Sequence, residues 1–482
     1  MKFLLYANFD KNNIKDRLGA ADYSYFFLLQ AFGSVLTDLG QVIELKDVSE
    51  VDAAYKHYAA QGESCVLLSF APPHKTPLGL SCPTIPVFAW EYPEIPECLG
   101  DEESWLDDPR HDWRLPLGVA GQAICLSRHT AEAVQRSMGR SYPIAAIPPP
   151  LPRVATALAA DGDPLRDGGT TLRINAALAD SRSMGLSADG LVHPDTLDET
   201  PFYPTDFELL PEPAQLATPY TAPTIATGLE QAATDVPDTE YSPPAPGSWE
   251  LPPRINVRVE LRGTVYTSVL TPSAGRKNWE DLITAFCWAF RDNEDATLLL
   301  KLAGRELPHN HLQLLMMLTK LSPFKCRVIA IYGYLPDQDY AALIKASTYY
   351  VNTSLCEGLC LPLVEFLNHG IPAIAPDNTA MADYIRDDIA FVVKSYPGVP
   401  TVWPHGDHQI NRTSFCQLDW KSLADSFKES YEVANHDAAR YRRMSLRASE
   451  SIQAYCGHEA VKESLGSFFQ IASSGSDITV DT

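Results

Sequence analysis

Residues 354–372, SLCEGLCLPLVEFLNHGIP, carry two glutamates, Glu357 and Glu365, on either side of a short run that contains glycine and proline. Glu357 follows the apolar run TYYVNTS (348–354), which predicts a strand, and Glu365 lies in LPLVEFLNHG (361–370), which predicts a helix. In parallel α/β sheets, ligands bind at the carboxyl ends of the strands. We therefore expect Glu357 to point into a cleft, and Glu365, which comes early on the helix, to face the same cleft.

The same alternation of strand-like and helix-like segments covers two parts of the chain. Strands that are apolar throughout and separated by helices indicate a parallel sheet covered on both faces. We predict an α/β fold with two Rossmann-like domains, 1–153 and 253–472, facing each other across a cleft. The strand-like runs are KFLLYANF, QVIEL, CVLLSF, IPVFAW, AICLS and PIAAIPP in the first domain, and VYTSVLT, ATLLLKLA, CRVIAIYG, TYYVNTS, IPAIAP and IAFVVK in the second.

A segment of different composition lies between the two domains. Residues 154–252 are rich in Ala, Pro, Asp, Thr and Gly and have weak periodicity, which predicts an irregular insertion at the domain crossing. The helices near the C-terminus would pack on the second domain or return to the first. The last residues, 473–482, are predicted to form a disordered tail.

Composition excludes several classes of protein. The net charge of −23 and the pI of about 4.9 disfavour a general nucleic-acid binder and strong adsorption to an anionic membrane. The 10 cysteines include no C-x-x-C pair and no zinc spacing, which favours reduced, partly buried thiols. No apolar stretch reaches the roughly 18 residues of a membrane span, and the apolar run at the N-terminus is too short for a signal peptide. We expect a soluble, cytoplasmic protein.

A second motif, SAGRKNWEDL (273–282), supplies positive charge after another predicted strand. Arg276 and Lys277 precede Asn278, an expected helix N-cap. Two cations at a helix N-terminus suit a phosphate group, although a solvated basic pair is the commoner arrangement. Two carboxylates suit a polyhydroxy ligand, because each can accept two hydrogen bonds from vicinal hydroxyls. A helix-capping Glu357 and a surface Glu365 would leave the glycine loop and the basic pair unexplained.

These features together resemble the retaining glycosyltransferases of family 4, which have the GT-B fold. In the second half, RKN starts a helix that ends in AF, followed by VIAIYGYLPDQDYAALIKAS and YYVNTSLCEGLCLPLVEFLNHGIPAIA, with an E-x7-E motif. The first half is similar only in outline, at WEYPEIP and LSRHTAEAV. The resemblance implies transfer of a hexose from a UDP- or GDP-linked sugar to a glycan or glycolipid hydroxyl, in bacterial surface polysaccharide synthesis. It implies no metal and no cofactor beyond the nucleotide-sugar co-substrate.

The resemblance also implies roles for individual residues, carried over by position. Glu365 would bind the ribose hydroxyls of the donor, and Glu357 would contact hydroxyls of the transferred sugar. Lys277, with Arg276, would hold the diphosphate. The remaining donor contacts would be the loop at Gly358, the backbone amides of Leu359, Cys360 and Leu361, and, near the base, Gly333 and Tyr334.

This chain departs from the family pattern before the phosphate lysine. Many members have an arginine five or six residues earlier, where this chain has Pro272 and Thr271, and Arg276 is expected to substitute. The first half would hold the acceptor, with the small residues 19–21 at the cleft floor. His74 would bind the transferred sugar, although a solvated loop histidine explains it equally well. Trp90 would stack on an acceptor sugar, but a buried core tryptophan is the better explanation.

Neither of two D-x-D triplets predicts a metal site. Asp161 and Asp163 are better explained by a turn, and Asp337 and Asp339 by the start of a helix. Two other functions remain open. A GT-B sugar-nucleotide 2-epimerase would show no dependence on an acceptor, and a non-catalytic GT-B scaffold would have no need of the paired glutamates. Contact with the inner face of a membrane and assembly into a homo-oligomer also remain open.

Overall fold

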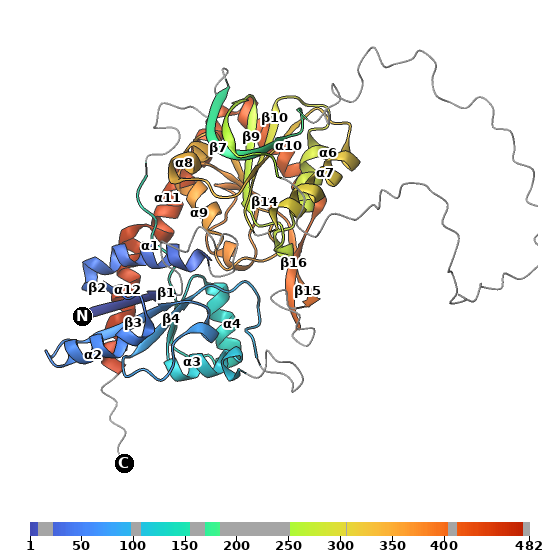
Figure 1. The fold of residues 1–482 in the computed structure, drawn as a ribbon. Helices are drawn as coiled ribbons and strands as arrows, with labels where there is room; N and C mark the ends of the chain where they lie inside the picture. The colour runs from blue at the N-terminus through green and yellow to red at the C-terminus, as the bar shows by residue number, and fades with distance from the viewer. Residues whose placement is uncertain are drawn as a thin grey trace, which may run out of the picture.

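The computed structural model describes residues 1–7, 23–97, 108–154, 169–183, 251–304, 306–402 and 412–475. These residues form two α/β domains, each built on its own sheet (Figure 1). The first domain is drawn in blue to cyan and the second mainly in green to orange. The predicted α/β fold class with two Rossmann-like domains is therefore confirmed.

The sheet of the first domain is parallel, with the strand order β2-β1-β3-β4-β5-β6. Every one of these strands coincides with an apolar run predicted above. The strands are β1 (Lys2–Ala7), β2 (Gln41–Glu44), β3 (Cys65–Phe70), β4 (Thr84–Phe88), β5 (Ala123–Cys125) and β6 (Ile144–Ala146). The helices are α1 (Tyr23–Leu39), α2 (Val51–Ala59), α3 (Arg114–Ala120) and α4 (Arg128–Met138), with short 3-10 turns η2 (Val48–Glu50), η3 (Pro73–Lys75) and η5 (Pro109–His111).

The sheet of the second domain has the order β14-β13-β12-β9-β10-β11-β7-β8, in which β7 runs antiparallel to both of its neighbours, β11 and β8. Helices α6 and α10 cover one face, and α8 and α9 cover the other. The strands are β7 (Thr170–Asp180), β8 (Ile255–Leu261), β9 (Thr264–Leu270), β10 (Ala296–Leu302), β11 (Arg327–Tyr332), β12 (Tyr349–Val351), β13 (Ala373–Pro376) and β14 (Ala390–Val393). The helices in this part of the chain are η7 (Gly275–Lys277), α6 (Trp279–Ala289), α7 (Leu307–Leu321), α8 (Asp337–Lys345), α9 (Leu361–Asn368), η8 (Thr379–Asp383), α10 (Trp420–His436), α11 (Ala438–Cys456) and α12 (His458–Gly475).

Three details of the predicted organisation are wrong. Residues 170–180, inside the segment predicted to be irregular, form β7, which extends the second sheet by pairing with β11 and β8. The hairpin of β15 (Ser395–Val402) and β16 (Arg412–Leu418) was not predicted. The tail was expected from residue 473, but α12 runs to Gly475. The parts 155–168, 184–250 and 476–482 of the predicted insertion and tail lie outside the described residues.

The C-terminal helix α12 completes the first domain. It contacts α1, and Phe469 on α12 packs against Phe3 of β1 with tilted rings whose centroids are 5.0 Å apart. Leu465 is fully buried in an apolar cluster that also contains residues of β1, α9 and α11. The alternative in which the last helix returns to the first half is therefore the observed one, and α11 and α12 tie the two domains together. Among the described residues, no helix is long and apolar enough to cross a membrane.

Shortening the buried side chain of α12 should loosen this tie. Leu465→Ala is expected to lower the free energy of unfolding by about 2–5 kcal/mol, because it leaves a cavity in a fully buried site. Leu446→Ala on α11, where the side chain is 50% exposed, is the matched control and should change stability by no more than about 0.5 kcal/mol. Urea unfolding measures both. Equal losses in the two variants would contradict the packing of α12 described here.

Candidate functional site

Two loops at the carboxyl ends of neighbouring strands build the site. The loop after β9 forms η7 with Arg276 and Lys277, and the loop after β12 carries Glu357 and leads into α9. Backbone bonds hold the loops together: Leu355 donates its N–H to the Arg276 carbonyl at 2.7 Å. The Thr353 hydroxyl also donates to the Lys277 carbonyl at 3.0 Å. The two sequence motifs, which are separated by about eighty residues, therefore meet at the carboxyl ends of neighbouring strands, as predicted.

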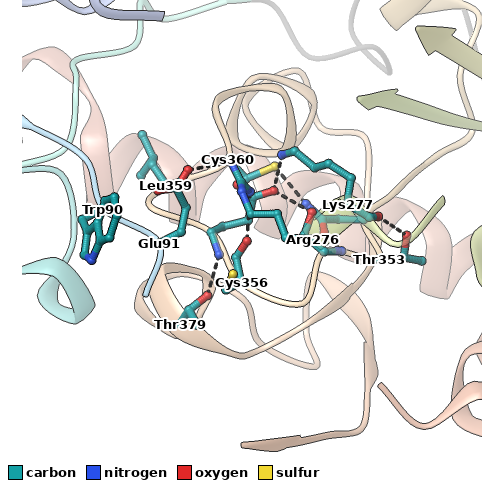
Figure 2. A network of polar contacts seen from close by, with 12 residues as sticks. Trp90, Glu91, Arg276, Lys277, Thr353, Cys356, Leu359, Cys360 and Thr379 are labelled. Carbon is teal, nitrogen blue, oxygen red and sulfur yellow. Dashed lines mark hydrogen bonds and ion pairs between the residues drawn. The ribbon is translucent and has the colours of Figure 1, made fainter. Parts of the chain in front are cut away.

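Glu357 is the centre of a buried ion cluster (Figure 2). Its Oε2 atom accepts a hydrogen bond from the Arg276 guanidinium at 2.8 Å, and its Oε1 atom is paired with the Lys277 ammonium. Ser354 Oγ donates to Oε1 at 2.6 Å. Burial by itself would raise the pKa of Glu357, but the charges of Lys277 and Arg276 outweigh burial and lower the pKa to about 2. Glu357 is thus ionised, and it fixes both cations in place.

Arg276 also reaches across to the first domain. Its Nη2 atom donates to Glu91 Oε1 at 2.6 Å, and both side chains are largely buried, with 15% and 17% of their area exposed. Glu91 follows β4 and is held by α4, because His129 Nε2 donates to the Glu91 carbonyl at 3.0 Å. Figure 2 shows Glu91 approaching Arg276 from the side of Trp90. The cluster of two cations and two carboxylates is electrically balanced as it stands.

Gly358 lies where the two domains touch. A Cβ atom at this position would come within 3.0 Å of Ala89 Cβ and of the Trp90 backbone nitrogen. A side chain here would therefore require the loop of the first domain to shift by a few tenths of an ångström. This close approach of the first domain favours glycine at position 358, whether or not Gly358 also contacts a ligand.

The start of α9 offers backbone donors next to the cations. In the described part of the chain, none of the four N–H groups from Gly358 to Leu361 donates a hydrogen bond to the protein. Cys360, at the N-cap, has a φ of 69°, which turns the backbone into the helix, and its Sγ accepts a hydrogen bond from Asn352 Nδ2 at 2.9 Å. Open donors at a helix N-terminus are suited to a phosphate or another anion.

Backbone strain is concentrated around these loops. Among the described residues, the non-glycine residues with positive φ are Asn278 (50°), Cys360 (69°) and Thr379 (48°). Asn278 follows Lys277, and Thr379 Oγ1 accepts the backbone N–H of Glu357 at 2.9 Å. Asn278 is the N-cap of α6 as expected, but its side chain bonds Asp281 instead of the helix backbone. Such strain persists where the surrounding structure over-determines the conformation, often at binding sites.

Glu365 lies apart from the ion cluster, on α9. Tyr340 of α8 donates its hydroxyl to Glu365 Oε2 at 2.9 Å. Burial raises the pKa of Glu365 to about 7, an effect that the Tyr340 hydrogen bond reduces only in part. A carboxyl group that titrates near neutrality and faces no cation among the described residues is available to hydroxyl donors.

The other predicted site residues have mixed outcomes. Gly333 has a φ of 83° directly after β11, and the Tyr334 carbonyl accepts a hydrogen bond from Arg254 at 3.0 Å. His74 Nδ1 accepts the Trp113 indole N–H at 3.1 Å, so His74 is tied to a tryptophan. Trp90 is 5% exposed, which agrees with a core tryptophan. The loop 19–21 and the pair Asp161 and Asp163 lie outside the described residues.

The remaining D-x-D triplet fits the start of a helix. Asp337 and Asp339 lie in the first turn of α8, although the N-cap is Pro336. Asp339 Oδ2 also accepts the backbone N–H of Asn175 from β7. Over the described ranges, no group of three or more His, Cys, Asp or Glu side chains is arranged to hold a metal ion.

Comparison with known proteins finds a family model that matches one segment of the chain and solved structures that share its fold. Residues 263–398, which contain both site loops, match the family model described as glycosyl transferases group 1. Sucrose-phosphate synthase from Thermosynechococcus elongatus has 13% identity and a TM-score of 0.51, covering 98% of this chain and 99% of that chain. Anabaena HepE, solved in complex with UDP and glucose, has 11% identity and a TM-score of 0.47, covering 99% and 100%. The search of curated proteins gives no match. The fold is GT-B, as predicted.

The buried carboxyl of Glu365 should make stability depend on pH. Because its pKa is raised above the unfolded value, the folded protein holds this proton more tightly, and stability falls as pH rises from about 4.5 through 7. Glu365→Gln, which cannot ionise, should be more stable than the unaltered protein by about 1–3 kcal/mol at pH 8, and by much less at pH 5. Denaturant unfolding at both pH values measures the difference. Glu432→Gln, at an exposed position of α10, is the control, and a pH-independent difference for Glu365→Gln would contradict the assignment.

Proposed function

We propose that this protein is a retaining glycosyltransferase that moves a hexose from a UDP- or GDP-linked sugar to a hydroxyl of a glycan or glycolipid acceptor. One observation carries the proposal. At the carboxyl ends of two neighbouring strands, two cations and a buried carboxylate lie beside open helix N–H groups. All of them belong to the segment that matches the glycosyl transferases group 1. This combination suits a ligand that carries both phosphates and hydroxyls.

The diphosphate would bind between Lys277 and the start of α9. Lys277 is paired with Glu357, but an ammonium has three donors, so it can also bind a phosphate oxygen. The N–H groups at Leu359, Cys360 and Leu361 would supply the opposite side. Glu357 would act mainly by holding the two cations, and its remaining lone-pair capacity is available for a hydroxyl of the transferred sugar.

The nucleoside would extend from there along the carboxyl edge of the sheet. Glu365 would accept hydrogen bonds from the ribose hydroxyls in addition to the bond from Tyr340, because a carboxylate has several acceptor sites. Because ionised carboxylate is the better acceptor, binding of the ribose would favour loss of the Glu365 proton. Gly333 and Tyr334, after β11, would lie near the base.

In the reaction, the bond between the anomeric carbon and the diphosphate breaks while the acceptor hydroxyl attacks from the same face. The electron pair goes to the diphosphate, whose oxygen takes the acceptor proton. Lys277 and Arg276 would stabilise the developing negative charge, and one such preorganised donor is typically worth about 3–4 kcal/mol. We propose that these cations take the role that a metal ion has in other transferases. The acceptor would approach from the first domain, and the setting would be polysaccharide synthesis at the cytoplasmic face of a bacterial membrane.

The first test is a thermal-shift titration with UDP- and GDP-linked hexoses. One donor should raise Tm, and Glu365→Ala should abolish the rise, because the ribose loses its acceptor. Glu432→Ala, on the exposed side of α10, is the control and should keep the full rise. A donor that binds equally well to Glu365→Ala would refute the ribose role, and no shift with any donor would favour the scaffold. Conversion of the bound sugar to its 2-epimer without an acceptor would favour the epimerase.

A second test uses Glu91, which occupies Arg276 in the observed arrangement. A diphosphate would add negative charge to a balanced cluster, so it competes with Glu91. Glu91→Gln should therefore tighten binding of the preferred nucleoside diphosphate by about 3- to 10-fold, measured by calorimetry at low salt. The control is Glu94→Gln in the same loop, which bonds Thr413 and touches neither cation. Weaker binding to Glu91→Gln would show that Glu91 supports the donor site instead of competing for it.

A further inference from the structure

Lys301 is a buried lysine in the centre of the second sheet. It is the residue before the last in β10, the strand between β9 and β11, and it lies beside Val269 on one side and Ile331 on the other. Leu298, Leu300 and Leu302 belong to the apolar cluster on the α6 and α10 face. Because side chains alternate along a strand, Lys301 lies on the opposite face, with α8 and α9.

The ammonium group of Lys301 has no partner in the described part of the chain. The residue is 8% exposed, and its Nζ atom, which forms no hydrogen bond or ion pair, is not among the fully buried unpaired atoms and so keeps some contact with solvent. Burial alone lowers its pKa to about 8, with no contribution from any nearby carboxylate. A lysine that is mostly buried without a carboxylate partner is unusual, and its charge is partly desolvated, although the Nζ atom still reaches solvent.

The fold gives no reason for a lysine at this position. Its cross-strand neighbours are aliphatic, and every other residue of β10 is apolar or, at Thr297, uncharged. A methionine would fill a similar volume without the desolvation cost. A residue that destabilises the fold and makes no compensating contact within the protein is expected where it binds a ligand.

The position of Lys301 relates it to the donor site proposed above. The strand β9, on one side, leads directly into the loop of Arg276 and Lys277, and β11, on the other side, leads into Gly333 and Tyr334. Gly333 donates its N–H to the Leu302 carbonyl at 2.9 Å, which joins the end of β10 to that loop. Lys301 therefore lies between the loop that would hold the diphosphate and the loop that would lie near the base.

We propose that Lys301 binds a phosphate oxygen of the nucleoside diphosphate, at the phosphate attached to the nucleoside. This inference rests on the proposed function, because it takes the ligand to be a nucleotide sugar. The phosphate supplies the anionic partner that the protein itself does not offer to this ammonium. The residue is thus a donor-binding residue in addition to Lys277 and Arg276.

The test measures affinity and stability in the same variants. Lys301→Met should weaken binding of UDP or GDP, whichever binds the unaltered protein better, by about 10- to 100-fold in calorimetry. Binding of the corresponding nucleoside, uridine or guanosine, should change by less than about two-fold, because it has no phosphate. In the absence of nucleotide, Lys301→Met should have an equal or higher Tm, since the unpaired charge is removed. Lys301→Arg should retain more affinity than Lys301→Met.

Controls separate this inference from the function on which it rests. Lys345→Met, at an exposed position on the neighbouring helix α8, should leave both affinity and Tm unchanged. If UDP or GDP binds and Lys301→Met binds it equally well, the role of Lys301 is overturned while the transferase proposal stands. A fall in Tm together with equal losses for nucleotide and nucleoside would make Lys301 a structural residue and also overturn the assignment. If neither UDP nor GDP binds the unaltered protein, both proposals fail.

Discussion

The chain of ion pairs from Glu91 through Arg276 to Glu357 is the interaction on which the site depends. It joins one loop of the first domain to two loops of the second, and its members are mostly buried. Removing one partner of a buried ion pair leaves an uncompensated charge, which typically costs about 3–5 kcal/mol. Because the desolvation cost of the charges offsets much of their attraction, the intact pairs contribute less to total stability than to fixing the relative position of the three loops. Arg276 still has one unsatisfied donor, because its buried Nε atom has no acceptor among the described residues.

Most of the fold could be predicted because its strands are unusually uniform. The central strands β3 and β10 are buried at every position, so their sequences are mostly apolar, apart from Ser69 in β3 and Thr297 and Lys301 in β10. The exceptions have a physical reason. β7 has the alternating burial of a strand near the sheet edge, and it lies in a segment whose Ala, Pro and Thr content hides this alternation. β15 contains Pro397, Gly398 and Pro400, residues that normally argue against a strand.

The site could be predicted only as far as local sequence determines it. Arg276, Lys277 and Glu357 follow neighbouring parallel strands, and the order of those strands brings them together without further information. Glu91 could not be found in this way, because its contact with Arg276 depends on how the two domains rest on each other. The sequence predicts that Gly358 contacts a ligand. The structure gives a second reason for glycine at this position, because the loop of the first domain packs against it. Tyr340 was missed because its bond to Glu365 joins two helices and follows no motif.

Several energetically unfavourable groups lie together at the carboxyl ends of the strands of the second sheet, which supports a ligand site there. The opposite face contains deeply buried tyrosines whose hydroxyls are all satisfied: Tyr266 by Ser430, Tyr349 by the Ser430 carbonyl and Tyr441 by the Thr348 carbonyl. At the carboxyl edge the protein instead has a left-handed cysteine, a carboxyl with a pKa near 7, open helix N–H groups and an unpaired ammonium. Each of these features could be replaced by a residue that fits the same backbone at a lower cost in stability. Their presence together at one edge is explained if a single ligand, anionic and rich in hydroxyls, offsets all of these costs when it binds.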